Sequence, residues 1–98
     1  MATSLQTHAL GNILRVVPVN PAANGDFIDE NGFFIRAETT GYIRYCPMNN
    51  KSDAEAIEKN FTASTIFVDP EICRKIFSTL TAGGQRTMAE NIYVGYGV

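Results

Sequence analysis

Apolar and polar residues alternate most regularly in the stretch from Phe33 to Pro47. Every second residue of 33–37 is apolar, and the alternation resumes over 42–45 after a break that ends at Gly41. A period of two is typical of β-strands. Glycine tolerates the positive φ that a tight turn requires. The pattern therefore predicts two strands joined at Gly41, on which the other segments pack or pair.

A second hairpin is predicted immediately upstream of Phe33. The dipeptide Asn31-Gly32 is the strongest two-residue turn signal in the chain, because a type I′ turn needs positive φ at both positions. We expect it to join a strand at Asp26–Glu30 to the strand at Phe33–Ala37. The strand that begins at Phe33 would then have a partner on either side.

Both ends of the chain are expected to contain strands. Asn12–Val19 is rich in β-branched residues, which favour the pleated surface of a sheet. Pro18 has no backbone N–H and places that end of the strand at a sheet edge or a bulge. The polar stretch Asn20–Gly25 is predicted to be a loop. Asn91–Val98 again alternates with a period of two and predicts a terminal strand.

Between the two halves the pattern is mixed. Ser52 and Glu55 fit a capping box, which predicts one or two helical turns within residues 49–60. Phe61–Val68 alternates and is predicted to be a strand.

The segment from Asp69 to Leu80 is compatible with two structures. Asp69 suits the N-cap of a helix, Pro70 suits its first position, and the apolar residues that follow recur at helical spacing. Local preferences therefore favour a helix. A strand is the alternative, because long basic side chains can lie along an apolar surface with their charged ends in water.

Composition limits the architecture to one core. A chain of 98 residues that is 45% hydrophobic and carries 18% charged residues is typical of one globular domain. We expect residues 1–98 to form a single β-rich domain with a flexible N-terminal arm at 1–10. The predicted fold is mainly β, a small antiparallel sandwich or barrel of five to six strands with one or two short helical segments.

The distribution of charge excludes several classes of partner. Eight basic and ten acidic residues give a net charge of −2, and only Arg74 and Lys75 form an adjacent basic pair. Binding to nucleic acid needs clustered basic residues, so we expect no nucleic-acid partner. The sequence has no membrane-length apolar run, and no lysine or arginine precedes Arg15. We therefore expect neither a membrane partner nor a signal peptide, and folding in a cytosol.

Residues that could support catalysis are few and scattered. His8 is the only histidine and lies in the predicted arm, while Cys46 and Cys73 are far apart and match no zinc-binding pattern. We expect both thiols to be unpaired and buried. The acidic residues within 26–31 lack the spacing of a calcium loop. The tripeptide Gly83–Gln85 is shared with peptide-chain release factors, but its flanks are apolar and predict a turn. We expect no enzyme activity, cofactor, metal or small-molecule substrate.

The C-terminal half, from Ser64 to Val98, resembles the closing segment of small β-sandwich proteins in tailed-phage virions. In those proteins a strand leads through a proline to an apolar residue, a basic pair, an aliphatic and an aromatic residue, and a last apolar strand ends the chain. The resemblance implies a virion subunit of the head-decoration, fibre-base or connector type. Its implied partners are copies of itself and other virion proteins. The matching residues are Pro70, Ile72, Arg74, Lys75, Ile76, Phe77, Thr79, Ala89 and Ile92.

The candidate functional residues are interface candidates on two predicted strands. Tyrosine is enriched at protein interfaces, although a row of tyrosines is equally typical of ordinary sheet packing. The two glycines of the last strand leave one of its faces almost bare, so we expect the strand at Asn91–Val98 to join a second chain. A soluble inhibitor or regulator of one host protein is the alternative function. The interface candidates are Tyr42, Tyr45, Tyr93, Gly95, Tyr96 and Gly97.

Overall fold

A computed structural model describes residues 13–49, 52–81 and 86–97, and these form a mainly β structure, as predicted. All strand pairs are antiparallel, and the strands form one six-stranded sheet in the order β1-β6-β2-β5-β3-β4. The strands are β1 (Ile13–Val19), β2 (Phe27–Ala37), β3 (Gly41–Pro47), β4 (Ile57–Phe61), β5 (Cys73–Ile76) and β6 (Ile92–Gly97). His8, Gly83–Gln85 and the predicted arm lie outside the described residues.

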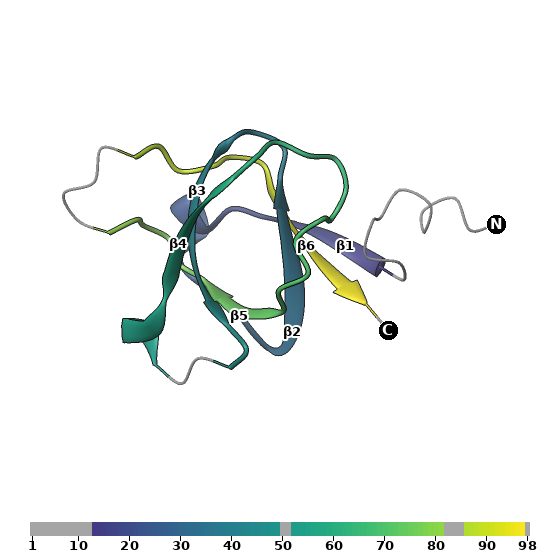
Figure 1. Ribbon diagram of the computed structural model, residues 1–98, viewed down its shortest axis with the longest axis horizontal. Helices are drawn as coiled ribbons and strands as arrows, with labels where there is room; N and C mark the ends of the chain where they lie inside the picture. The colour runs from purple at the N-terminus through teal and green to yellow at the C-terminus, as the bar shows by residue number, and fades with distance from the viewer. Residues whose placement is uncertain (1–12, 50–51, 82–85, 98) are drawn as a thin grey trace.

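The sheet curls around its core but does not close. Figure 1 shows β4 and β1 on opposite sides of the molecule, and these two strands do not pair. A closed barrel or a two-sheet sandwich is therefore not confirmed. The alternation predicted for β2 and β3 is confirmed, because their inward residues are buried. The core cluster comprises Phe33, Ile35, Ala37, Ile43, Tyr45, Phe61, Cys73, Ile76, Ala89, Ile92 and Val94.

The hairpin predicted at Gly41 is wrong in its pairing. β2 and β3 exist, but β5 lies between them and pairs with both. Gly41 has no positive φ. It is needed for close approach instead, because a Cβ atom there would lie 2.6 Å from the backbone of Ala89. Alternation identifies strands but carries no information about which strands are neighbours.

The hairpin predicted at Asn31-Gly32 is also wrong, since β2 runs continuously from Phe27 to Ala37. Gly32 has the expected positive φ of 92°, but Asn31 does not, so a type I′ turn cannot form. The carboxylate of Asp29 accepts the N–H of Asn31, and the pairing with β5 shifts register between Ile28 and Phe33. β2 therefore contains a bulge, and its two halves pair with different strands, β5 and then β6.

The segment with two possible structures contains the strand β5, not a helix. Asp69 accepts the N–H of Glu71 in a local turn, and the helix does not begin. Cys73 and Ile76 enter the core as neighbours of β2 and β3. The adjacent Lys75 is neutralised by Asp53, with Nζ 2.7 Å from a carboxylate oxygen. Burial between two strands thus outweighs the local preference for helix.

Three smaller predictions are corrected in the connecting segments. Only the first residue of the strand predicted at Phe61–Val68 lies in a strand, because β4 ends at Phe61. Residues 62–72 then cross the outer face of β2 and β6 (Figure 1). The predicted helical turn is a 3-10 turn at Asp53–Glu55, but the Ser52 side chain makes no capping bond. The loop predicted at Asn20–Gly25 contains a short helix, α2 (Pro21–Asn24).

Candidate functional site

β1 forms one edge of the sheet and pairs only with β6 among the described residues. Of the two positions predicted for the Pro18 end, an edge or a bulge, the structure shows the edge. The register places Val17 opposite Val94 and Pro18 opposite Tyr93, with a bulge between Ile13 and Arg15. The other side of the strand has no neighbouring strand among the described residues.

The hydrogen-bond pattern shows which backbone groups of β1 face outward. The N–H of Glu38 donates to the carbonyl of Asn91, so Asn91, Tyr93 and Gly95 direct their backbone groups toward β2. Alternate residues of β6 must then face β1 and bond with Arg15, Val17 and Val19. Val16 and Pro18 consequently face away from the sheet. Pro18 has no N–H to offer, so Val16 carries the outward pair of donor and acceptor.

Two exposed aliphatic side chains occupy this edge strand. Leu14 is 65% exposed and Val16 is 36% exposed. Val16 lies opposite Gly95, and a Cβ atom on Gly95 would lie 2.8 Å from the ring of Phe67. Val16 thus lies on the face of the sheet that Phe67 partly covers. An apolar edge strand with unpaired backbone groups is a template for another strand.

The single charged residue of β1 is held against the chain's own surface. The guanidinium carbon of Arg15 lies 4.3 Å from the centre of the Tyr96 ring. The hydroxyl of Tyr96 donates to Asp29 at 2.8 Å. Burial and this bond raise the pKa of Tyr96 to about 12. The Asn31 N–H, the Tyr96 hydroxyl and the charge of Arg15 lower the pKa of Asp29. Arg15 therefore adds little unbalanced charge to the edge.

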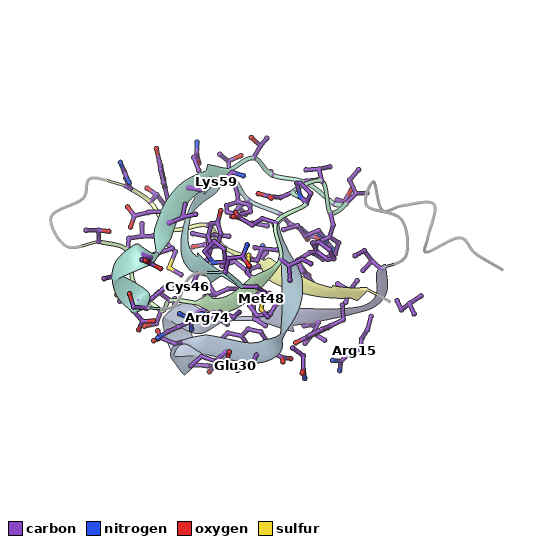
Figure 2. The ribbon with its side chains drawn as sticks, turned by 60° about the horizontal axis from the view of Figure 1, so that its bottom comes forward. Arg15, Glu30, Cys46, Met48, Lys59 and Arg74 are labelled. Atoms are coloured by element: carbon purple, nitrogen blue, oxygen red, sulfur yellow. The ribbon has the colours of Figure 1, made fainter. Side chains whose placement is uncertain are left out.

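The opposite edge, β4, carries a different surface. The backbone groups of Tyr42 bond with Thr87 and Ala89, so the same alternation turns Glu58 and Asn60 outward. Glu58 accepts from the N–H and hydroxyl of Thr81 and pairs with Arg86 at 2.7 Å. Its neighbour Lys59 pairs with Asp69. In Figure 2, Lys59 and Arg15 lie on well-separated parts of the molecule.

The structure separates the predicted interface candidates. Tyr93, Gly95, Tyr96 and Gly97 lie together on β6, next to the β1 edge. β6 itself has no free edge over Ile92–Gly95, because β1 and β2 occupy both sides, and the face expected to be bare is filled by Phe67. The expectation of a bare face is therefore wrong at Gly95, whereas the joining of Asn91–Val98 to a second chain stays a prediction.

The other tyrosines are engaged within the chain. Tyr45 is 1% exposed, and its hydroxyl donates to Glu71 at 2.6 Å, so this side chain belongs to the core. The guanidinium carbon of Arg86 lies 4.7 Å from the centre of the Tyr42 ring. The guanidinium carbon of Arg36 lies 4.3 Å from the centre of the Tyr93 ring. Tyr42 therefore does not lie beside the interface candidates on β6. Sequence reasoning missed Leu14 and Val16, although Pro18 already indicated an edge strand.

A hollow of about 840 Å³ lies between the end of β1, α2 and residues 88–93. Asp26, one of its acidic residues, accepts the N–H of Ser78 and lies near Lys75, so its role is structural. Both cysteines are free and buried, and burial raises the pKa of the Cys46 and Cys73 thiols. Nothing in this hollow pairs a nucleophile with a base among the described residues.

The described residues also bear on metal binding and on membrane insertion. No three His, Cys, Asp or Glu side chains in this part of the chain gather where a metal ion could bind. Its helices are all too short or too polar to cross a membrane. The chain matches no family model, no curated protein and no solved structure.

Proposed function

We propose that this protein is a non-enzymatic structural subunit that joins a larger assembly through the β1 edge. The observation that carries the proposal is the combination of outward backbone groups at Val16 with exposed side chains at Leu14 and Val16. An exposed apolar edge left unprotected favours addition of a strand, which supplies both hydrogen bonds and apolar contact. The charged residues of β4 make the same event unfavourable at the other edge.

The assembly we propose is a tailed-phage virion. The support is the resemblance of residues 64–98 to small virion proteins, three of whose matching residues here belong to the core cluster. These residues are Ile76, Ala89 and Ile92. Partners would be copies of the chain and neighbouring virion proteins, and assembly would occur in the bacterial cytoplasm.

Sedimentation of assembled particles tests this proposal. The wild-type chain should co-sediment with particles in a lysate that contains them. The variant Val16→Pro should fold but remain in the soluble fraction, because it removes the outward N–H without removing a bond to β6. Equal sedimentation of both chains would show that the β1 edge is not used. A wild-type chain found only in the soluble fraction, bound to one host protein, would overturn the structural role in favour of a regulator.

A further inference from the structure

We infer that the strand added to β1 is β1 of a second copy of this chain, paired antiparallel about a two-fold axis at Val16. This inference rests on the proposed function and names its partner. Val16 would lie opposite Val16 of the other copy, Arg15 opposite Val17, and Leu14 opposite Pro18. The resulting sheet would run continuously through both subunits.

The backbone pattern selects Val16 as the centre. A two-fold axis through a pair of hydrogen-bonded residues requires a residue whose N–H and C=O both face outward. Val16 meets this requirement, whereas Pro18 lacks the N–H and Leu14 lies in the bulge. Centring the pair on Val17 would place the carbonyl of Val16 opposite Pro18, leaving that acceptor without a donor. Pairing about Val16 satisfies both of its groups in each copy.

Side-chain chemistry is also complementary in this register. Leu14, the most exposed aliphatic residue of the strand, would meet the apolar ring of Pro18. Arg15 would lie opposite Val17 and not opposite its own counterpart. It is also already held over Tyr96, near Asp29. The two Arg15 side chains therefore do not lie directly opposite each other, and each charge is partly neutralised. This removes the like-charge repulsion that a symmetric contact usually brings.

Pairing of β1 with β4 of another copy is disfavoured by the same reasoning. That contact would place Glu58 and Lys59 against the aliphatic side chains of β1 and disturb their pairs with Arg86 and Asp69. It would also be a heterologous contact, which forms rings or open filaments and not a closed pair. The symmetric β1 contact closes on itself at two copies.

Oxidative cross-linking of the purified chain tests the register. In the proposed pair the two Val16 Cα atoms lie about 5.5 Å apart, within the range of roughly 4.4–6.8 Å that a disulfide spans. The variant Val16→Cys should therefore form a linked dimer with oxidised glutathione. The matched control is Leu14→Cys, which is more exposed but would lie roughly 13 Å from its counterpart. Wild type is the blank, because Cys46 and Cys73 are buried.

We expect Val16→Cys to cross-link at least tenfold faster than Leu14→Cys, and a mixture of Leu14→Cys with Pro18→Cys to cross-link as a heterodimer. Light scattering should give wild type a mass approaching twice the 10.7 kDa of the chain as concentration rises, and Val16→Pro a monomer mass. Equal or faster linking of Leu14→Cys, or a monomeric wild type, would overturn the pairing. If wild type still co-sediments with particles and Val16→Pro does not, the proposed function stands and only the identity of the partner is wrong.

Discussion

The two edges of the sheet differ in how they are protected. Among the described residues, both β1 and β4 pair with a strand on one side only, and both turn alternate backbone groups outward. β4 carries Glu58 and Lys59, each tied into an ion pair, beside Ile57, which is 37% exposed. β1 carries the exposed aliphatic residues Leu14 and Val16, with Pro18 next to them and Arg15 held over Tyr96. The comparison indicates that the chain prevents association at one edge and leaves the other available.

The largest difference should appear when proline is placed on the two sides of β1. Val17→Pro removes an N–H that faces β6 and leaves a buried carbonyl unpaired, which should lower the free energy of unfolding by about 3 kcal/mol. Val16→Pro removes an outward N–H and should cost less than about 1 kcal/mol. Urea denaturation followed by circular dichroism measures both. Equal losses would show that the assignment of outward groups is wrong.

A smaller effect is expected from the residues that hold Arg15 on the β1 side. Tyr96→Phe keeps the ring under Arg15 but removes the hydroxyl that donates to Asp29, which should cost about 1 kcal/mol. Because the pKa of Tyr96 is raised from 10.0 to about 12 in the folded chain, its contribution is complete below pH 10 and is lost as the pH rises toward 12.

The check is the difference in unfolding free energy between wild type and Tyr96→Phe, measured from pH 8 to 12. That difference should be constant up to about pH 10 and shrink above it. The Tyr45→Phe difference should also shrink above pH 10, because burial and the bond to Glu71 raise the pKa of Tyr45 too, at a position far from the edge. A difference that does not change with pH would contradict the role given to the bond with Asp29.

The contrast between the edges explains which parts of the structure could be predicted. Alternation identified the strands at Gly41–Pro47 and Ile92–Gly97, because a half-buried strand must bury every second residue, and β-branched residues identified the strand at Ile13–Val19. Pro18 correctly indicated an edge strand. The order of the strands could not be predicted, since β5 reaches its place between β2 and β3 through contacts distant in sequence.

The same limit applies to the candidate site. The bare face of β6 was identified correctly at Gly95, but Phe67 fills it from a segment that was predicted to be a strand. Asn31-Gly32 has the sequence of a tight turn, yet pairing with β5 and β6 extends β2 through it. In both cases the residue pattern indicated a local structure that the segment could adopt. Contacts with residues distant in sequence determined the structure that formed.

Converting β4 into an apolar edge should change association more than stability. The variant Lys59→Val removes a charge whose side chain is 48% exposed and whose pair with Asp69 is at the surface. Exposed pairs contribute about 0–1 kcal/mol, so the free energy of unfolding should change by less than about 0.5 kcal/mol. In a Val16→Pro background, which blocks β1, light scattering should then detect new self-association. A monomeric double variant would show that charge does not protect β4.

The smallest expected effect concerns the attachment of Thr81 to the β4 edge. Glu58 accepts two hydrogen bonds from Thr81 and forms an ion pair with Arg86. These contacts lower the pKa of Glu58, with the Thr81 N–H as the largest cause, followed by the Thr81 hydroxyl and the Arg86 charge. A lowered pKa means that these contacts stabilise the folded chain above pH 4.5 and are lost as the pH falls through the folded-state value. Protonation would weaken the two hydrogen bonds that Thr81 donates to Glu58. The amide signal of Thr81, followed by NMR from pH 6 to 3, should therefore titrate with a midpoint below 4.5, and Glu58→Gln should remove the titration. Glu58→Gln should leave the pH dependence of the β1 signals unchanged, because Val16 lies at the opposite edge and the carboxylate near that edge is Asp29. A midpoint at or above 4.5, or a titration that persists in Glu58→Gln, would show that β4 is not protected in this way.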